Sequence, residues 1–419
     1  MDKKNSFQWG PFLKAVATIS IPIALANLLT TTGSMVDTMM IASLGENSVA
    51  AVGLCAQFSS LLFSCYWGFV GGGILFFSQY WGSKDERGIE RSYGIVLSCM
   101  MVVGVVFASL ALFFPHFIMK VYTDKESIQR IGEEYLRVVG LAYPLQIYAT
   151  CLTTCLRSTE RVRIPLIGSI CSVLSNLFLN WVFIFGNLGF PAMGVRGAAL
   201  ATTLAALINV LVVLVASRAT SFLYIFRFRH HFAWNREFLA LFFKKCFPII
   251  CNELFIGVGN MVINVALGHQ SEPTIAAVAV FRTLEGFIIA FFTGFASATS
   301  VLIGKRVGSG ELDDAYESAL RLVYLCQVVI LLAMVLVLTI HSPLLGLLGL
   351  SGESYRTCTS FLWIFSFFGV VRMGNWVQNE ICRSSGDATT GTVMEISFMA
   401  LMIIPSVAVS AFLFHAPVL

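Results

Sequence analysis

The chain has 419 residues, of which 57% are hydrophobic and 12% are charged, and its mean hydropathy is +0.82. Soluble proteins carry about 25% charged residues, so this chain has too few charged side chains to cover a surface that faces water. The composition excludes a soluble globular protein and predicts an integral membrane protein. The formal net charge of +4 is modest, and we expect no nucleic-acid partner.

Apolar stretches long enough to cross a bilayer as helices recur along the chain. A transmembrane helix needs about 20 apolar residues, whereas the strands of a membrane barrel are about ten residues long and alternate polar with apolar residues. The sequence therefore predicts an all-α integral membrane protein with about eleven spans. These spans are approximately 15–41, 49–80, 93–114, 133–156, 164–186, 195–217, 241–267, 274–304, 319–340, 357–381 and 391–414.

The distribution of Lys and Arg gives the orientation of these spans. Of the 27 Lys and Arg residues, 19 fall in segments on the N-terminal side of the membrane, 5 fall on the other side, and 3 fall within spans. Lys and Arg accumulate in cytoplasmic loops. We therefore expect a multi-pass protein of the cell (inner or plasma) membrane with its N-terminus in the cytoplasm.

The sequence also matches itself at one constant offset, which aligns residue 22 with residue 248 and is called the repeat offset below. Residues 22–84 and 248–310 share 14 identities in 63 positions without a gap. Because the first unit holds six spans, the second enters the membrane in the same orientation, a plan typical of secondary transporters. We expect two pseudo-symmetric six-helix lobes, at 1–218 and 241–419, joined by a cytoplasmic linker at 219–240.

The second copy is shorter than the first. Residue 419 corresponds to residue 193, which lies before the sixth span of the first copy. The sixth span therefore has no counterpart in the second copy, and the sequence contains no twelfth helix. We expect a truncated chain rather than a protein that functions with eleven helices.

The linker carries RFRHHFAWNREF, which predicts a basic segment on an anionic leaflet. A metal site at His230 and His231 is the less favoured interpretation, since adjacent residues do not share a helix face.

Ionisable groups inside spans are energetically costly and are candidate functional residues. Asp37 lies among apolar residues near the outer end of the first span, where its carboxyl could exchange a proton or a sodium ion; a simple hydrogen bond between helices is the alternative. Asn176 and Asn180 share a helix face four residues apart and could coordinate sodium or join a proton network with Asp37. Thr202 could add a hydroxyl, although each of these polar residues could also serve only helix packing.

The ionisable candidates of the second half are Glu253, Arg282, Glu285 and Arg372, followed by Glu380 and Glu395. Glu253 could take a second proton or bind a cationic substrate, or could form a structural hydrogen bond. Arg282 and Glu285 are three residues apart, a spacing that favours an internal ion pair over a substrate contact. Arg372 could neutralise Glu253 or Glu285, or face an anionic substrate.

Several stretches resemble the multidrug and toxic compound extrusion (MATE) family. They are VDTMMIASLG from 36, SQYWGSKD at 78–85, LRSTERVRIP from 156, NLFLNWVFIFGNLGFPAMGVRGAALAT at 176–202, FPIICNELFIGVG from 247 and CRSSGDATTG from 382. The resemblance covers nearly all of 10–415. It implies two six-helix lobes around a V-shaped cleft, and a transporter rather than an enzyme, exporting cationic or amphiphilic organic compounds in exchange for protons or sodium.

The resemblance also assigns roles to single residues. It makes Asp37 the coupling residue of the N-terminal lobe, partnered by Asn180 and Thr202. Ile184 stands where some members carry an acid, and Arg372 stands where the sodium-coupled branch carries an Asp. These departures favour protons over sodium, with transient Na⁺ near Asp37 as the alternative. We expect no cofactor, no bound metal and a monomer in the lipid bilayer.

Two other functions stay open. A lipid-linked saccharide flippase of the wider superfamily would have a larger, strongly cationic cleft and more helices. A membrane sensor or enzyme would need clustered nucleophiles, bases or metal ligands, whereas the six histidines are scattered along the chain.

Overall fold

The computed structural model describes residues 8–222, 224–268, 272–347, 352–398 and 400–401, and the regular elements in these ranges are all helices. The first half contains α1 (Trp9–Ala42), α2 (Glu46–Gly82), α3 (Glu86–Phe113), α4 (Pro115–Tyr122), α5 (Glu126–Val139), α6 (Ala142–Ser158), α7 (Arg163–Phe185) and α8 (Val195–Ala219). A short 3-10 helix, Tyr224–Phe226, and α9 (Phe228–His231) form the linker. The second half contains α10 (Arg236–Gly268), α11 (Glu272–Gly308), α12 (Leu312–Leu347), α13 (Gly352–Ser385) and α14 (Ala388–Phe398).

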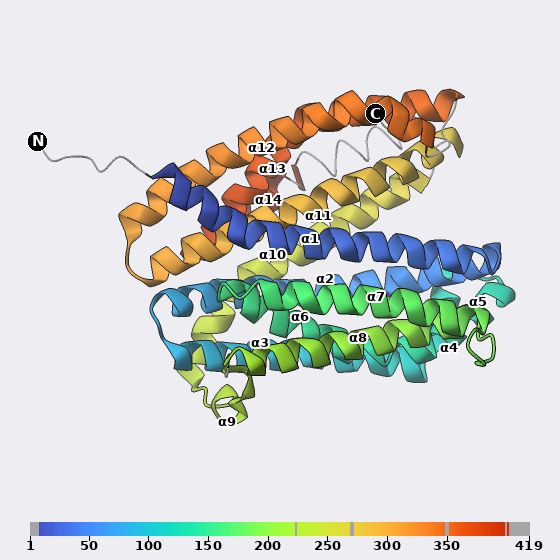
Figure 1. The fold of residues 1–419 in the computed structure, drawn as a ribbon, viewed down its shortest axis with the longest axis horizontal. Helices are drawn as coiled ribbons and strands as arrows, with labels where there is room; N and C mark the ends of the chain where they lie inside the picture. Colours follow the sequence, from blue (N-terminus) through green and yellow to red (C-terminus); the bar gives the residue numbers. More distant parts are fainter. Residues whose placement is uncertain (1–7, 223, 269–271, 348–351, 399, 402–419) are drawn as a thin grey trace, which may run out of the picture.

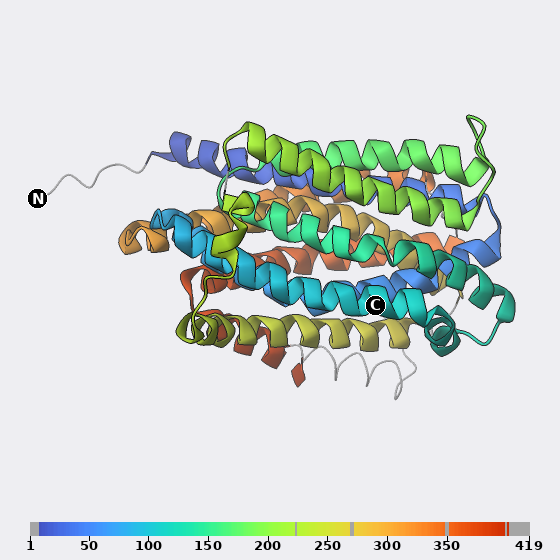
Figure 2. The same ribbon diagram turned by 90° about the horizontal axis from the view of Figure 1, so that it is seen from below.

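The long helices run along the longest axis of the molecule (Figure 1, Figure 2). Within the described residues, eight helices are long and apolar enough to cross a membrane, and the pair α5 and α6 counts as a ninth if it forms one span. The all-α membrane fold is confirmed. The predicted seventh span falls in α10, which is not one of the eight, and the eleventh lies mostly outside the described residues.

The span predicted at 133–156 is broken rather than continuous. Helices α5 and α6 meet at an angle of 49° around Gly140 and Leu141. Pro144 lacks a backbone N–H and lies in the first turn of α6, a position where a helix tolerates proline. The hydrophobic pattern continues through the break, so a count of apolar residues does not detect it.

We call the end of the bundle where α1 begins and α2 ends the linker end, because α9 lies there, and the opposite end the far end (Figure 1). The two halves touch reciprocally at the linker end. A Cβ on Gly82 would overlap the carbonyl oxygen of Lys305, and a Cβ on Gly308 would overlap the carbonyl oxygen of Gln79. The repeat offset relates Gly82 to Gly308, and it also relates Gln79 to Lys305. Such exchange of partners is the property of a twofold relation.

The symmetry also exchanges the first helices of the two halves. Helix α1 packs on α11, and its counterpart α10 packs on α2. Phe12 and Val16 of α1 accordingly belong to the hydrophobic core of α11, α12 and α13, while Phe242 and Cys246 of α10 belong to the core of the first half. The first helix of each half therefore packs into the hydrophobic core of the other half, and this packing holds the two halves together at the linker end.

Helices α2 and α10 are closest near the linker end and separate toward the far end. A Cβ on Gly72 would overlap the Sγ atom of Cys246, whereas a Cβ on Gly257, nearer the far end, would lie 3.4 Å from the Oγ atom of Ser64. The interface between the halves is therefore tightest at the linker end.

Candidate functional site

Asp37 on α1 and Asn180 on α7 form a direct polar contact. The Nδ2 atom of Asn180 donates to Oδ1 of Asp37 at 2.5 Å and also contacts Oδ1 of Asn176 at 3.3 Å. Asn180 is fully buried, and its own Oδ1 has no hydrogen-bond partner within the described part of the chain. The structure thus brings together three of the four polar residues singled out in the first half of the sequence.

The fourth, Thr202, lies on α8. Its hydroxyl donates to the carbonyl oxygen of Ala198 in the same helix at 3.0 Å, so its described hydrogen bond does not reach Asp37. A residue that the sequence analysis missed is Tyr135 of α5, a largely buried tyrosine within electrostatic range of the Asp37 carboxylate. Nothing in the local sequence around Tyr135 predicts this, because almost a hundred residues separate it from Asp37 and only the fold brings the two near each other.

A second polar cluster surrounds Arg383 near the end of α13. The Nη2 atom of Arg383 is 2.9 Å from Oε1 of Glu253 on α10 and 3.9 Å from Oε2 of Glu395 on α14, and its Nη1 atom is 3.7 Å from Oε1 of Glu380. Arg383 is only 8% exposed. The cation that pairs with Glu253 is therefore Arg383 and not Arg372.

Neutral donors complete the shell around these carboxylates. The hydroxyl of Ser300 donates to Oε2 of Glu380. Asn252 donates to Oε2 of Glu395 at 2.8 Å, and Asn379 donates to the same oxygen. We call Glu253, Glu380, Arg383 and Glu395 the acidic cluster. Three negative groups and one positive group give it a formal charge of −2 when all are ionised.

Arg372, on the same helix as Arg383, pairs with a different acid. Its Nη1 atom is 2.5 Å from Oε1 of Glu285 on α11. Of the two partners that the sequence allowed for Arg372, the structure selects Glu285. This ion pair crosses between helices, because α11 and α13 pack side by side.

A cavity of about 310 Å³ lies between α2 of the first half and the helices of the second half. Trp67 of α2 and Trp376 of α13 contribute aromatic surface to its wall. The ionisable residues on the wall are Glu253, Arg372, Glu380, Arg383 and Glu395. The cavity therefore combines apolar and aromatic surface with an excess of carboxylates, which is a suitable environment for an organic cation.

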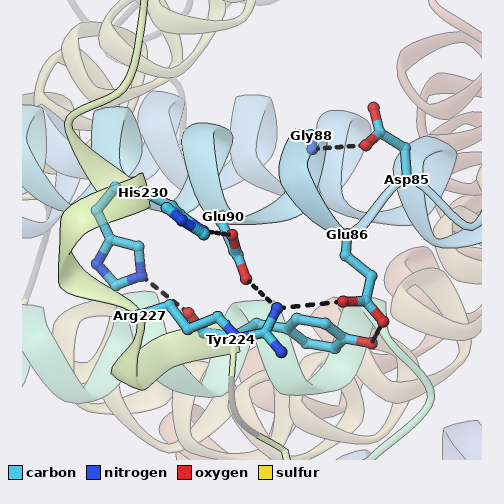
Figure 3. Close-up of polar contacts among 8 residues, drawn as sticks. Asp85, Glu86, Gly88, Glu90, Tyr224, Arg227 and His230 are labelled. Atoms are coloured by element: carbon cyan, nitrogen blue, oxygen red, sulfur yellow. Dashed lines mark hydrogen bonds and ion pairs between the residues drawn. The ribbon is translucent and has the colours of Figure 1, made fainter.

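The linker is attached to the first half through Glu90 of α3 (Figure 3). The carboxylate of Glu90 is fully buried, and it lies 2.9 Å from Nη1 of Arg227 and 2.6 Å from Nδ1 of His230. Arg227 also contacts the exposed Glu86 at 3.2 Å. The pair of histidines thus serves a docking contact: His230 meets Glu90, and His231 donates to the carbonyl oxygen of Tyr224 at 2.9 Å.

Burial changes the pKa of His231. Its side chain lies in a nearly inaccessible position, and this desolvation lowers the pKa of His231 below the ordinary 6.5. The hydrogen bond to Tyr224 and the charge of Glu90 oppose the effect, while His230 adds to it. A Cβ on Gly94 of α3 would overlap the carbonyl oxygen of His231, so the linker backbone lies directly on α3.

The two halves are also joined by polar contacts at the linker end. Lys305 of α11 reaches both carboxylate oxygens of Glu160, each at 2.8 Å, and Trp81 donates to Glu160 at 3.0 Å. In the symmetric position, Gln79 donates to the carbonyl oxygen of Ser384 at 2.9 Å. The repeat offset relates Gln79 to Lys305, whereas their partners Ser384 and Glu160 are two positions out of register in the repeat, so only one side of each contact follows the pseudo-symmetry.

The sequence profile of the MatE family matches residues 22–182 and, a second time, residues 248–408. The second match therefore follows the first at the repeat offset, which also governs the reciprocal contacts between the halves. The chain belongs to the MATE family. Membership of this family places the chain among transporters rather than enzymes.

Relatives and solved structures agree with the MATE assignment. The "Probable multidrug resistance protein YoeA" of Bacillus subtilis is 24% identical over 390 residues, which cover 91% of this chain and 83% of the relative. The "Probable multidrug resistance protein NorM" of Listeria monocytogenes is 24% identical over 323 residues, covering 74% and 69%. A MOP superfamily transporter from Pyrococcus furiosus superposes with a TM-score of 0.82 at 19% identity, over 97% of this chain and 90% of that chain. This last likeness shows the fold.

Proposed function

We propose that this MATE transporter is an antiporter that exports cationic or amphiphilic organic compounds in exchange for protons. The observation that carries the proposal is the cavity between the halves, whose wall combines Trp67 and Trp376 with three carboxylates. An aromatic face and a carboxylate attract an organic cation together, because one contacts the apolar body and the other the charge. The multidrug resistance names of its relatives support the same substrate class.

The proposed ion site is Asp37 with Asn180 and Asn176. A carboxylate with one strong donor amid apolar helices can be ionised or protonated at modest free-energy difference, which exchange with an ion requires. Amide oxygens beside it could also coordinate sodium, but Arg372 introduces a positive charge where the sodium-coupled branch of the family has an acid. We therefore propose protons as the coupling ion.

In this proposal, proton entry is coupled to substrate export by alternating access, in which the cavity opens to one side of the membrane at a time. With the linker end in the cytoplasm, as the distribution of Lys and Arg predicts, the tight contacts at that end correspond to a state closed to the cytoplasm. Protonation of Asp37 would favour rearrangement of the halves and opening toward the cytoplasm, and the substrate would favour return. The protein would act as a monomer in the plasma membrane.

The test is transport of a fluorescent cationic dye in everted membrane vesicles, driven separately by a pH gradient and by a sodium gradient. We expect uptake with the pH gradient, no uptake with sodium alone, and loss of uptake in Asp37→Asn. Glu46→Gln is the control, because this exposed acid lies near the same end of the bundle. Sodium-driven uptake would overturn the choice of ion, and absence of uptake under both gradients would overturn the antiport proposal.

A further inference from the structure

The acidic cluster has more carboxylates than its arginine needs. Arg383 is hydrogen-bonded to Glu253 at 2.9 Å, and this single pair already neutralises both charges. Glu380 and Glu395 lie 3.7 Å and 3.9 Å from the guanidinium, beyond hydrogen-bonding distance, and are held by neutral donors instead. Two surplus negative charges in a largely buried site are unfavourable without a further cation.

The internal repeat shows that these acids are not required to bury an arginine at this position. The repeat offset relates Arg383 to Arg157, and it relates Glu253, Glu380 and Glu395 to Asn27, Thr154 and Ser169. Every acid of the cluster thus corresponds to a neutral residue in the first half. The Nε atom of Arg157 is nonetheless buried without a partner, and Arg157 has no ion pair among the described residues. The three acids therefore serve a purpose beyond neutralising their arginine.

Polar atoms in and around the cluster are left without partners in the described part of the chain. They are the Nε atom of Arg383, Oδ1 of Asn379 and Oδ1 of Asn252. Arg383 and Asn379 are each 8% exposed, and both line the cavity described above. A buried polar atom without a partner is unfavourable, and here such atoms belong to two residues of the cavity wall that also carries the surplus carboxylates of Glu380 and Glu395. Two surplus carboxylates on the wall of a cavity indicate a place for a ligand cation.

We propose that Arg383 is a tethered counter-cation that competes with a cationic substrate for Glu380 and Glu395. This inference rests on the proposed function, which places an organic cation in the same cavity. In the empty cavity the guanidinium, held by Glu253, partly compensates the two other carboxylates. An entering substrate cation binds Glu380 and Glu395 against the repulsion of Arg383. The arginine thus weakens cation binding enough for release, and it selects against weakly charged compounds, which leave Arg383 in place.

The decisive variant removes the arginine and its hydrogen-bonded acid together. Glu253→Gln with Arg383→Gln preserves shape and leaves the cluster's formal charge at −2, but removes the competing cation. We expect the purified variant to bind tetraphenylphosphonium about tenfold more tightly than the wild type, in line with the energy of a charged contact. Glu134→Gln with Arg196→Gln is the matched control, since it removes an exposed ion pair between α5 and α8 whose residues do not line the cavity, and it should change the affinity by less than about twofold.

A second variant keeps the proposal testable if the first fails to fold, which thermal unfolding would reveal. Glu380→Gln leaves the pair of Arg383 and Glu253 intact, and we expect it to bind tetraphenylphosphonium about tenfold more weakly. If the wild type binds the cation but the double variant does not bind it more tightly, or Glu380→Gln does not bind it more weakly, the competition by Arg383 is wrong. The proposed function would stand in either case. If neither wild type nor variants bind the cation, the proposed function fails together with this inference.

Discussion

Gly82 and Gly308 are counterparts in the internal repeat, and each faces the carbonyl oxygen of the residue three positions before the other. Ser78 and Gly304, which are also counterparts, contact one another directly, because a Cβ on Gly304 would overlap the Ser78 hydroxyl. A residue that touches its own counterpart lies on the symmetry axis. The axis of the duplicated fold therefore passes through the α2–α11 contact at the linker end.

Replacement of Gly308 tests the function of this contact. In Gly308→Ala the new methyl group meets the backbone of Gln79, which cannot move as a side chain would, so the closed linker end is disfavoured. We expect dye transport to fall by about tenfold while the protein still folds. Gly286→Ala on the same helix is the control, because open space surrounds that glycine. Equal transport by the two variants would contradict a functional role for the contact.

Asn180→Ala tests the ion site without removing the acid. A hydrogen bond to a charged group contributes about 1.5–3 kcal/mol, so its loss should reduce proton-driven transport about tenfold or more. Asn176→Ala removes only the outer amide, which contacts Asn180 at 3.3 Å, and should reduce transport by less than about threefold. Transport assays on the two variants in parallel decide the matter; a normal rate in Asn180→Ala would exclude Asn180 from coupling.

Glu90→Gln tests the attachment of the linker to α3. The buried carboxylate loses two charged contacts, but Arg227 and His230 are 43% and 49% exposed and can return to water. We therefore expect the free energy of unfolding to fall by about 1–2 kcal/mol, less than when a charge is stranded inside a protein. Thermal unfolding measures the change. Glu86→Gln, which removes an exposed contact of the same arginine, should lower stability by less than about 0.5 kcal/mol; equal effects would argue against a special role of Glu90.

The linker should also respond to pH through His231. Its pKa is lowered in the docked linker, mainly by burial, so the docked state favours neutral imidazole. Docking is then fully stable above the ordinary pKa of 6.5 and weakens as the pH falls through and below that value. We expect weaker protection from hydrogen exchange in residues 224–234 at about pH 5 than at about pH 7.5, once the rates are corrected for the intrinsic pH dependence of amide exchange, and a smaller difference in His231→Gln. Equal or stronger protection at low pH would contradict this role of His231.

The sequence was sufficient to predict the membrane fold and the duplication, and it singled out Asp37 as an acid within a span. These rest on signals that composition and spacing carry directly: long apolar runs, a constant offset, and a charge among apolar residues. The contact of Asn176 with Asn180 was predictable because residues four apart share a helix face. The contact between Asp37 and Asn180 was an open possibility from the residues and gained support from the family resemblance, but 143 residues separate the two, so no local spacing predicts it.

Other features depend on how helices pack, and the sequence did not reveal them. Arg383 follows a long apolar span and was counted among the charges that orient the protein, but the close approach of α10 and α14 buries it among acids. Glu285 pairs with Arg372 across helices because α11 and α13 are adjacent. Sequence spacing identifies possible partners on the same helix, but it does not show which residues of other helices come close.

Protons released when the substrate binds test the central claim, exchange of an ion for a cationic compound, most directly. Tetraphenylphosphonium is added to the purified protein in weak buffer at about pH 6.5, and a pH-sensitive dye reports the protons. The account predicts release from the wild type and clearly smaller release from Asp37→Asn. Binding of the cation without any release of protons, or release unchanged by Asp37→Asn, would contradict it.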